Sequence, residues 1–78
     1  DNVIAFNLYP SINNGEFTIS FDSNSEKFIE VIDVMGKIVY SQKFSSQEIP
    51  LKLNLSSGAY YARVVSEGNI GVKKFVVQ

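Results

Sequence analysis

The stretch "LNLSSGAYYARVV", residues 53–65, decides the fold because it joins two apolar runs through a corner. Apolar and polar residues alternate up to Leu55, three small residues follow, and a second apolar run begins at Ala59. In many Greek-key β-sandwiches, a tyrosine near the start of a late strand turns its hydroxyl group back onto the backbone a few residues upstream. Tyr60, two residues after Gly58, occupies this position. We therefore predict that Tyr60 is buried and structural rather than a ligand-binding residue.

The same alternation recurs along almost the whole chain. Short runs rich in Val, Ile, Phe and Tyr are separated by Gly, Asn, Ser and Pro, which is the pattern of strands, and no segment keeps the period of a helix. The sequence predicts strands over about residues 3–9, 16–21, 27–34, 37–44, 49–55, 59–66 and 70–77. Strands with one apolar face bury that face by stacking two sheets. We expect an all-β fold, a seven-stranded immunoglobulin-like antiparallel β-sandwich.

The length of the chain supports one hydrophobic core. With 78 residues, we expect a single domain over residues 1–78, in which residues 1–7 form a linker or the first strand. The chain begins with Asp1 and its only methionine is Met35, so we expect it to be a piece of a longer polypeptide.

The composition argues against several classes of function. The net charge of −1 does not supply the basic face that a nucleic-acid-binding protein needs. No apolar run approaches the roughly 20 residues of a membrane span. The sequence contains no Cys and no His, which removes the thiolate nucleophile, the commonest general base and the commonest metal ligand. We therefore expect no catalytic site, no cofactor and no metal.

The turns and the aromatic residues offer weak alternatives to a structural interpretation. Asp22–Glu26 carries oxygen ligands at alternate positions, like a calcium loop, but it lacks the length and the glycine of one, and a solvated turn is favoured. Asp33 precedes a tight hairpin turn at Gly36 and is expected to bind backbone amides there. Three tyrosines remain candidates for sugar binding in the absence of Trp: Tyr40, Tyr60 and Tyr61.

The last predicted strand is apolar on both faces. Phe75 and Val77 lie on one face and Val72 and Val76 on the other, so one face can enter the core while the other stays exposed. An exposed apolar stripe beside lysines is suited to recognition by a partner, although lysines on an edge strand also discourage aggregation. Because the strand ends the domain, we expect removal of residues 76–78 to cost few core contacts.

Four blocks of sequence, taken together, resemble the C-terminal sorting domain of the type IX secretion system of Bacteroidetes. They are "YPSINNG", "DVMGKIV", "LSSGAY" and "KKFVVQ", at residues 9–15, 33–39, 55–60 and 73–78. The first block has Ser11 and Ile12 where the family has Asn and Pro, and the chain ends on Gln78 where the family often has a basic residue. The resemblance covers the chain from about residue 8 to the last residue. The resemblance implies that six residues are structural residues of the family motifs: Pro10, Gly15, Asp33, Gly36, Gly58 and Tyr60.

The resemblance implies a secretion signal. The domain is then carried behind a larger cargo protein, folds in the periplasm and is read by the outer-membrane translocon, after which a sortase-like peptidase removes it and the cargo remains secreted or at the cell surface. The residues implied in translocon recognition are Lys73, Lys74, Phe75, Val76, Val77 and Gln78. The alternatives are a fibronectin- or immunoglobulin-like surface module that binds carbohydrate or protein, and a structural spacer.

Overall fold

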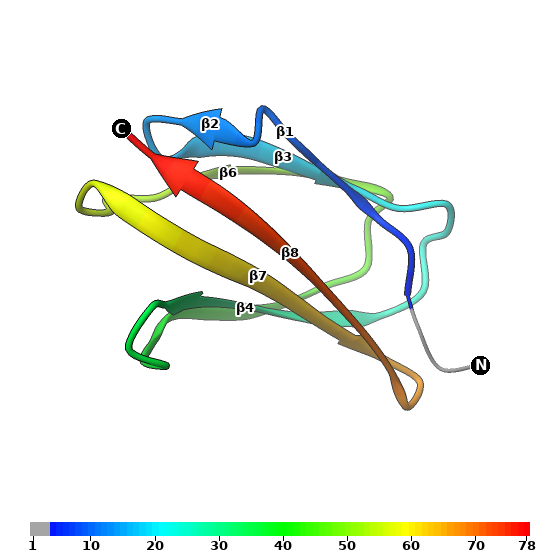
Figure 1. Ribbon diagram of the computed structural model, residues 1–78. Coiled ribbons are helices and arrows are strands. Elements are labelled where there is room, and N and C mark those ends of the chain that lie inside the picture. Colours follow the sequence, from blue (N-terminus) through cyan, green and yellow to red (C-terminus); the bar gives the residue numbers. More distant parts are fainter. Residues whose placement is uncertain (1–3) are drawn as a thin grey trace.

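The computed structural model describes residues 4–78, which form eight β-strands. The strands are β1 (Asn7–Tyr9), β2 (Ile12–Asn13), β3 (Glu16–Ser20), β4 (Lys27–Asp33), β5 (Ile38–Phe44), β6 (Glu48–Lys52), β7 (Gly58–Ser66) and β8 (Asn69–Val77). They build a three-stranded sheet of order β1-β3-β6 and a five-stranded sheet of order β2-β8-β7-β4-β5. Figure 1 shows the two sheets stacked as a sandwich. Among the described residues there is no helix able to cross a membrane.

The predicted all-β sandwich is confirmed. Strands β1, β3 and β6 correspond in order to strands A, B and E of the immunoglobulin fold, and β8, β7 and β4 correspond to G, F and C. The prediction of seven antiparallel strands needs correction, because there are eight and β2 runs parallel to β8. The extra strand arises because the chain leaves one sheet after Tyr9 and joins the other at Ile12. Pro10 lies between them and lacks the amide needed to continue a ladder.

The other strand boundaries differ from the predictions by a few residues. β1 begins at Asn7, so residues 4–6 lie in no strand, and residue 3 lies outside the described residues. β6 ends at Lys52 instead of Leu55 because its ladder with β3 ends at the pair Glu16–Lys52. Beyond that pair, the chain is held by a single bond from the Leu53 amide to the Gly15 carbonyl, 2.8 Å long.

The core lies between the sheets and is filled by alternate residues of both. Phe75 of β8 is its centre, 1% exposed, with its ring centroid 4.6 Å from that of Phe17 and 5.7 Å from that of Tyr60. The remaining buried apolar side chains are Phe6, Leu8, Ile19, Ile29, Val31, Ile49, Leu51, Ala62, Val64 and Val77. Because the opposing sheet is narrower, β5 lies beyond the core and none of its residues is fully buried.

Candidate functional site

The C-terminal strand divides its side chains between the core and the surface. β8 pairs antiparallel with β7 from Asn69 to Val77, so alternate residues face opposite ways. Phe75 and Val77 enter the core, with Val77 only 3% exposed. Val76 and Val72 face outwards and are 36% and 54% exposed. Of the residues implied in recognition, Phe75 and Val77 are therefore not accessible to a partner while the domain stays folded.

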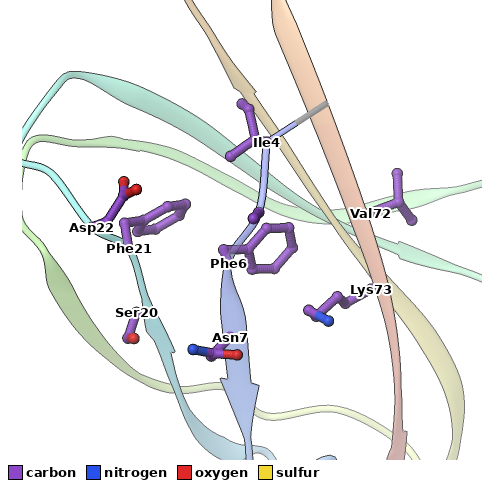
Figure 2. A pocket seen from close by; sticks show the side chains of 9 residues that line it. Ile4, Phe6, Asn7, Ser20, Phe21, Asp22, Val72 and Lys73 are labelled. Carbon is purple, nitrogen blue, oxygen red and sulfur yellow. The ribbon is translucent and has the colours of Figure 1, made fainter. Parts of the chain in front are cut away.

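The two lysines of β8 lie on opposite faces of the sheet. Lys74 is exposed on the outer face, in register with Tyr61 of β7. Lys73 lies on the other face, with its ammonium group 6.0 Å from the centre of the Phe6 ring. Figure 2 shows the Lys73 side chain on the Phe6 side of β8, with Val72 directed away. The pair therefore does not form one basic patch.

A hollow of about 580 Å³ lies beside Lys73, between the N-terminal segment and β8. Figure 2 shows the side chains around it, which are Ile4, Ala5, Phe6, Asn7, Ser20, Phe21, Asp22, Val72 and Lys73. Polar and apolar atoms contribute about equally to its wall, and the polar ones include amide, hydroxyl, carboxylate and ammonium groups of Asn7, Ser20, Asp22 and Lys73. Within residues 4–78, no cluster of acidic side chains is suited to hold a metal ion. The hollow offers contact surface but no arrangement for acid–base or nucleophilic chemistry.

The end of β8 is held by the segment that follows Pro10. Ile12 and Asn13 of β2 pair parallel with Val76 and Val77. The Val76 amide donates a hydrogen bond to the Ser11 carbonyl, and the Gln78 amide donates one to the Asn13 carbonyl, both 2.8 Å long. Figure 1 shows the C-terminus lying beside β2. We call this pairing of residues 11–13 with residues 76–78 the terminal clip.

Asn13 fixes the turn that carries the terminal clip. Its side chain is buried, its Nδ2 donates to the Pro10 carbonyl at 2.9 Å, and its Oδ1 accepts from the Gly15 amide at 2.8 Å. A buried amide side chain with both ends paired stabilises one backbone conformation. From the sequence, Asn13 was quoted only as part of the first block, residues 9–15, and was given no role of its own. The sequence did contain a signal for its role in the turn, because Asn13 lies two residues before Gly15 and an Asx turn bonds the Asn side chain to the backbone two residues on.

Gly15 allows the turn to lie against the loop after β6. Its φ is +103°, a conformation that other residues rarely adopt, and its carbonyl accepts a hydrogen bond from Leu53. A β-carbon at Gly15 would collide with the Leu53 carbonyl oxygen. The first sequence block thus joins both sheets: β2 pairs with β8, and Gly15 contacts the loop after β6.

The middle block, residues 33–39, forms a hairpin turn between β4 and β5. The Asp33 Oδ1 atom accepts hydrogen bonds from the amides of Met35 and Lys37, both 2.9 Å long, as its position before the turn suggested. Gly36 has a φ of +85° and open space around it. The side chains of Val34 and Met35 are exposed at the tip of the hairpin.

The corner before β7 has the geometry predicted for Tyr60. Tyr60 is buried, and its hydroxyl group donates a 2.7 Å hydrogen bond to the Ser56 carbonyl. Gly58 is the first residue of β7. Tyr61 lies on the opposite face of β7, and Tyr40 lies on β5 in register with Val31. The three tyrosines considered for sugar binding are therefore not brought together.

Lys27 is a buried cation that the sequence analysis missed. It is 3% exposed, and its Nζ donates hydrogen bonds to the carbonyls of Ser25, Ser23 and Ser46 at 2.6, 2.9 and 3.3 Å. The ammonium group also lies 4.6 Å from the centre of the Phe21 ring. The loop weighed as a calcium site thus directs two of its carbonyls to a lysine of the domain itself.

Burial lowers the pKa of Lys27 below its ordinary value, and the nearby Asp22 carboxylate opposes that shift. Lysine is unfavourable in the core unless its ammonium group is hydrogen-bonded, and here three carbonyls supply the bonds. A signal was present in the sequence: Lys27 shares the inward face of β4 with Ile29 and Val31. Elsewhere on the sheet, an ion pair of 2.6 Å between Arg63 and Glu30 lies between β7 and β4.

Comparison with known proteins agrees with this architecture. A family described as "Secretion system C-terminal sorting domain" matches residues 7–78. The fold is similar to part of the solved structure of PorZ, described as an essential surface component of the type IX secretion system of Porphyromonas gingivalis. That match has a TM-score of 0.78 and 16% identity, and covers 95% of this chain but 11% of PorZ. No curated protein sequence matches the chain. The chain belongs to the family of type IX secretion system C-terminal sorting domains.

Proposed function

We propose that the domain directs an attached cargo protein through the outer-membrane type IX translocon to the cell surface, and that a sortase-like peptidase then removes it. Membership of the sorting-domain family supports export towards the surface. The observation that carries the finer proposal is the terminal strand. It presents Lys74 and Val76 outwards from a fixed backbone, and its last amide is bound by the terminal clip. The part read by the translocon is residues 73–78, through the side chains that the fold leaves accessible.

A surface of this kind suits recognition without catalysis. The accessible side chains of residues 73–78 supply apolar contact and positive charge. Alternate exposed side chains on a strand can specify a partner. The outward amides of Val76 and Gln78 are already bonded within the terminal clip, so recognition rests on the side chains. The buried neighbours Phe75 and Val77 anchor the strand in the core. In this proposal, the translocon binds the folded sandwich, with the outward side chains of β8 in their native positions.

A reporter fusion tests the proposal. An unrelated periplasmic protein is placed before residues 1–78 in a bacterium that has the type IX pathway, and surface reporter is labelled with a reagent that cannot cross the membrane. We expect label on the fused reporter and none on the reporter alone. In a strain without the translocon, the fusion should stay in the periplasm. Loss of the mass of the domain from labelled reporter would support the peptidase step.

Two outcomes would contradict the proposal. If the folded fusion stays in the periplasm of the strain that has the type IX pathway, the domain is not a sufficient secretion signal. A surface binding module or a structural spacer is then the better description. If the fusion reaches the surface equally well without the translocon, the route is a different one.

A further inference from the structure

The outer edge of β5 is a long strand edge that, among the described residues, is neither interrupted by proline nor covered by another segment, although it carries Lys43. β5 pairs with β4 on one side and with no strand on the other. A β-bulge at Val39, next to Ile38, disturbs one end, but the ladder is regular from Tyr40 to Phe44. An unpaired edge of this kind is a template for an added strand.

The other edges are blocked by local chemistry. In β6, residues whose backbone groups bond to β3 alternate with residues whose backbone groups point away from the sheet. Pro50 is one of the second kind, and it has no amide hydrogen to offer to a further strand. β1 has three residues and is followed by Pro10. β8 is covered near one end by a 3.1 Å bond from Ile4 to Ile70, and at the other by the terminal clip. β5 has neither proline nor cover.

The register shows which groups β5 offers. The Asp33 amide binds the Lys37 carbonyl, so odd-numbered residues of β4 direct their backbone groups towards β5. Their partners in register are even-numbered residues of β5. The backbone groups of Ser41 and Lys43 therefore point away from β4, and within residues 4–78 they have no backbone partner. An added strand can bind both amides without disturbing the sheet.

The side chains of this edge define the sequence of an added strand. Tyr40 and Phe44 lie half-buried on the inner face, at the margin of the core, while Lys43 is exposed on the outer face. Residues 34–47 include two lysines and no acidic residue. Opposed residues of paired strands share a face, so apolar residues suit the inner face and an acidic residue suits the position beside Lys43.

We propose that the edge of β5 binds an extended segment of another protein in which apolar residues alternate with acidic ones. The segment adds as a sixth strand to the five-stranded sheet, with its main chain bonded to Ser41 and Lys43 and its carboxylates beside Lys43. A second copy of this chain is the poorer partner, because two β5 strands bring lysines and no opposite charge to each other. The site is separate from β8 and does not depend on the proposed secretion signal.

Amide hydrogen exchange of the domain, followed by NMR, tests this proposal. The probe is a blocked peptide of about nine residues, a common strand length, in which Val alternates with Glu and Thr. Its control carries Lys in place of Glu. In the free domain, the amides of Ser41 and Lys43 should exchange fast, and those of Tyr40 and Gln42 should be protected. Saturating acidic peptide should slow the first pair about tenfold or more and leave the second pair unchanged.

Two variants of the domain complete the test. Lys43→Glu should weaken binding of the acidic peptide by about two- to fivefold and strengthen binding of the lysine peptide, as expected for a cross-strand charge pair. Ser41→Pro removes one outward amide and should weaken both peptides by about fivefold or more, with the amide spectrum elsewhere unchanged.

Three results would overturn the proposal. The first is no slowing at Ser41 and Lys43 with the acidic peptide at millimolar concentration. The second is protection by the peptide on the edge of β8, at Val72 and Lys74. The third is protection of Ser41 that rises with domain concentration in the absence of peptide, which would identify a second copy as the occupant.

Discussion

The hydroxyl group of Tyr60 lies 2.7 Å from the carbonyl oxygen of Ser56 and donates a hydrogen bond to it. This bond joins the first residues of β7 to the loop that crosses from the other sheet, so it fixes the angle at which the chain changes layers. The ring of Tyr60 contributes separately, by packing against Phe75 in the core.

Tyr60→Phe removes the hydroxyl group and keeps the ring. Ser56 is exposed, so water can replace the lost donor, and we expect the free energy of unfolding to fall by about 1 kcal/mol. Tyr60→Ala removes the packing as well and should cost about 3–5 kcal/mol. Chemical denaturation measures both. An unchanged midpoint for Tyr60→Phe would show that the bond contributes nothing to stability.

Gly15→Ala and Gly36→Ala form a matched pair, because both glycines have positive φ but only Gly15 touches backbone. Gly36→Ala should cost about 1–2 kcal/mol from the conformation alone. Gly15→Ala forces a collision with the Leu53 carbonyl and should cost about 3 kcal/mol or more. Thermal unfolding of the two variants decides. Equal losses would mean that the turn moves away from the loop at little cost.

Val76→Ser and Val77→Ser separate recognition from folding. Val77 is buried in the core, so Val77→Ser should lower the free energy of unfolding by about 2–3 kcal/mol. Val76 faces outwards, and Val76→Ser should change it by about 0.5 kcal/mol. In the reporter fusion, Val76→Ser should reduce surface labelling although the domain stays folded. Normal labelling with Val76→Ser would remove that side chain from the recognition surface.

The same pair of residues corrects an expectation from the sequence. Removal of residues 76–78 deletes the buried Val77 and both bonds of the terminal clip, so the truncated domain should be clearly destabilised rather than nearly intact. Point changes are the sharper test of the proposed signal for this reason.

The buried ammonium group of Lys27 predicts a dependence of stability on pH. Because burial lowers its pKa in the folded domain, the folded state loses the proton before the unfolded chain, whose lysine titrates near 10.5. Between the pKa of Lys27 in the folded domain and its pKa in the unfolded chain, the unfolded state binds more protons. The free energy of unfolding should therefore rise with pH across this interval. Lys27→Met should lack that rise. Chemical denaturation gives the free energy of unfolding of both proteins at several alkaline pH values. Subtracting the value for Lys27→Met from the wild-type value cancels the contribution of the titrating tyrosines.

The Lys27→Met variant also tests whether Lys27 stabilises the loop of residues 22–26. If the difference between the wild-type domain and Lys27→Met falls with rising pH, the three carbonyls outweigh burial and favour the charged form. The exchange of amides in residues 22–26 should become faster in Lys27→Met, because Ser23 and Ser25 lose a shared partner.

Local patterns predicted the parts of the fold that depend on neighbours in sequence. Alternating apolar residues located the long strands, Asp33 located the hairpin turn, and Gly58 with Tyr60 located the corner. Each of these features depends on residues a few positions apart. The stacking of two sheets then followed from the single apolar face of each strand.

The features that were missed depend on contacts between distant segments. β2 has two residues, too few to show any period, and exists only because β8 lies beside it. Lys27 was placed in a strand, and two of its acceptors lie within four residues of it, but its burial is completed by the Ser46 carbonyl from the loop after β5. The uncovered edge of β5 could not be recognised before the order of strands was known.

The terminal clip also sets an order of events in time. β2 lies near the start of the domain and its partner is the last strand, so a chain that is made or threaded from its N-terminus holds β2 without a partner until β8 has appeared. Pairing of such distant segments closes a long loop of chain, which slows folding. The sandwich therefore closes only after the whole domain has emerged, because a chain interrupted before β8 leaves β2 and one edge of β7 without a partner strand.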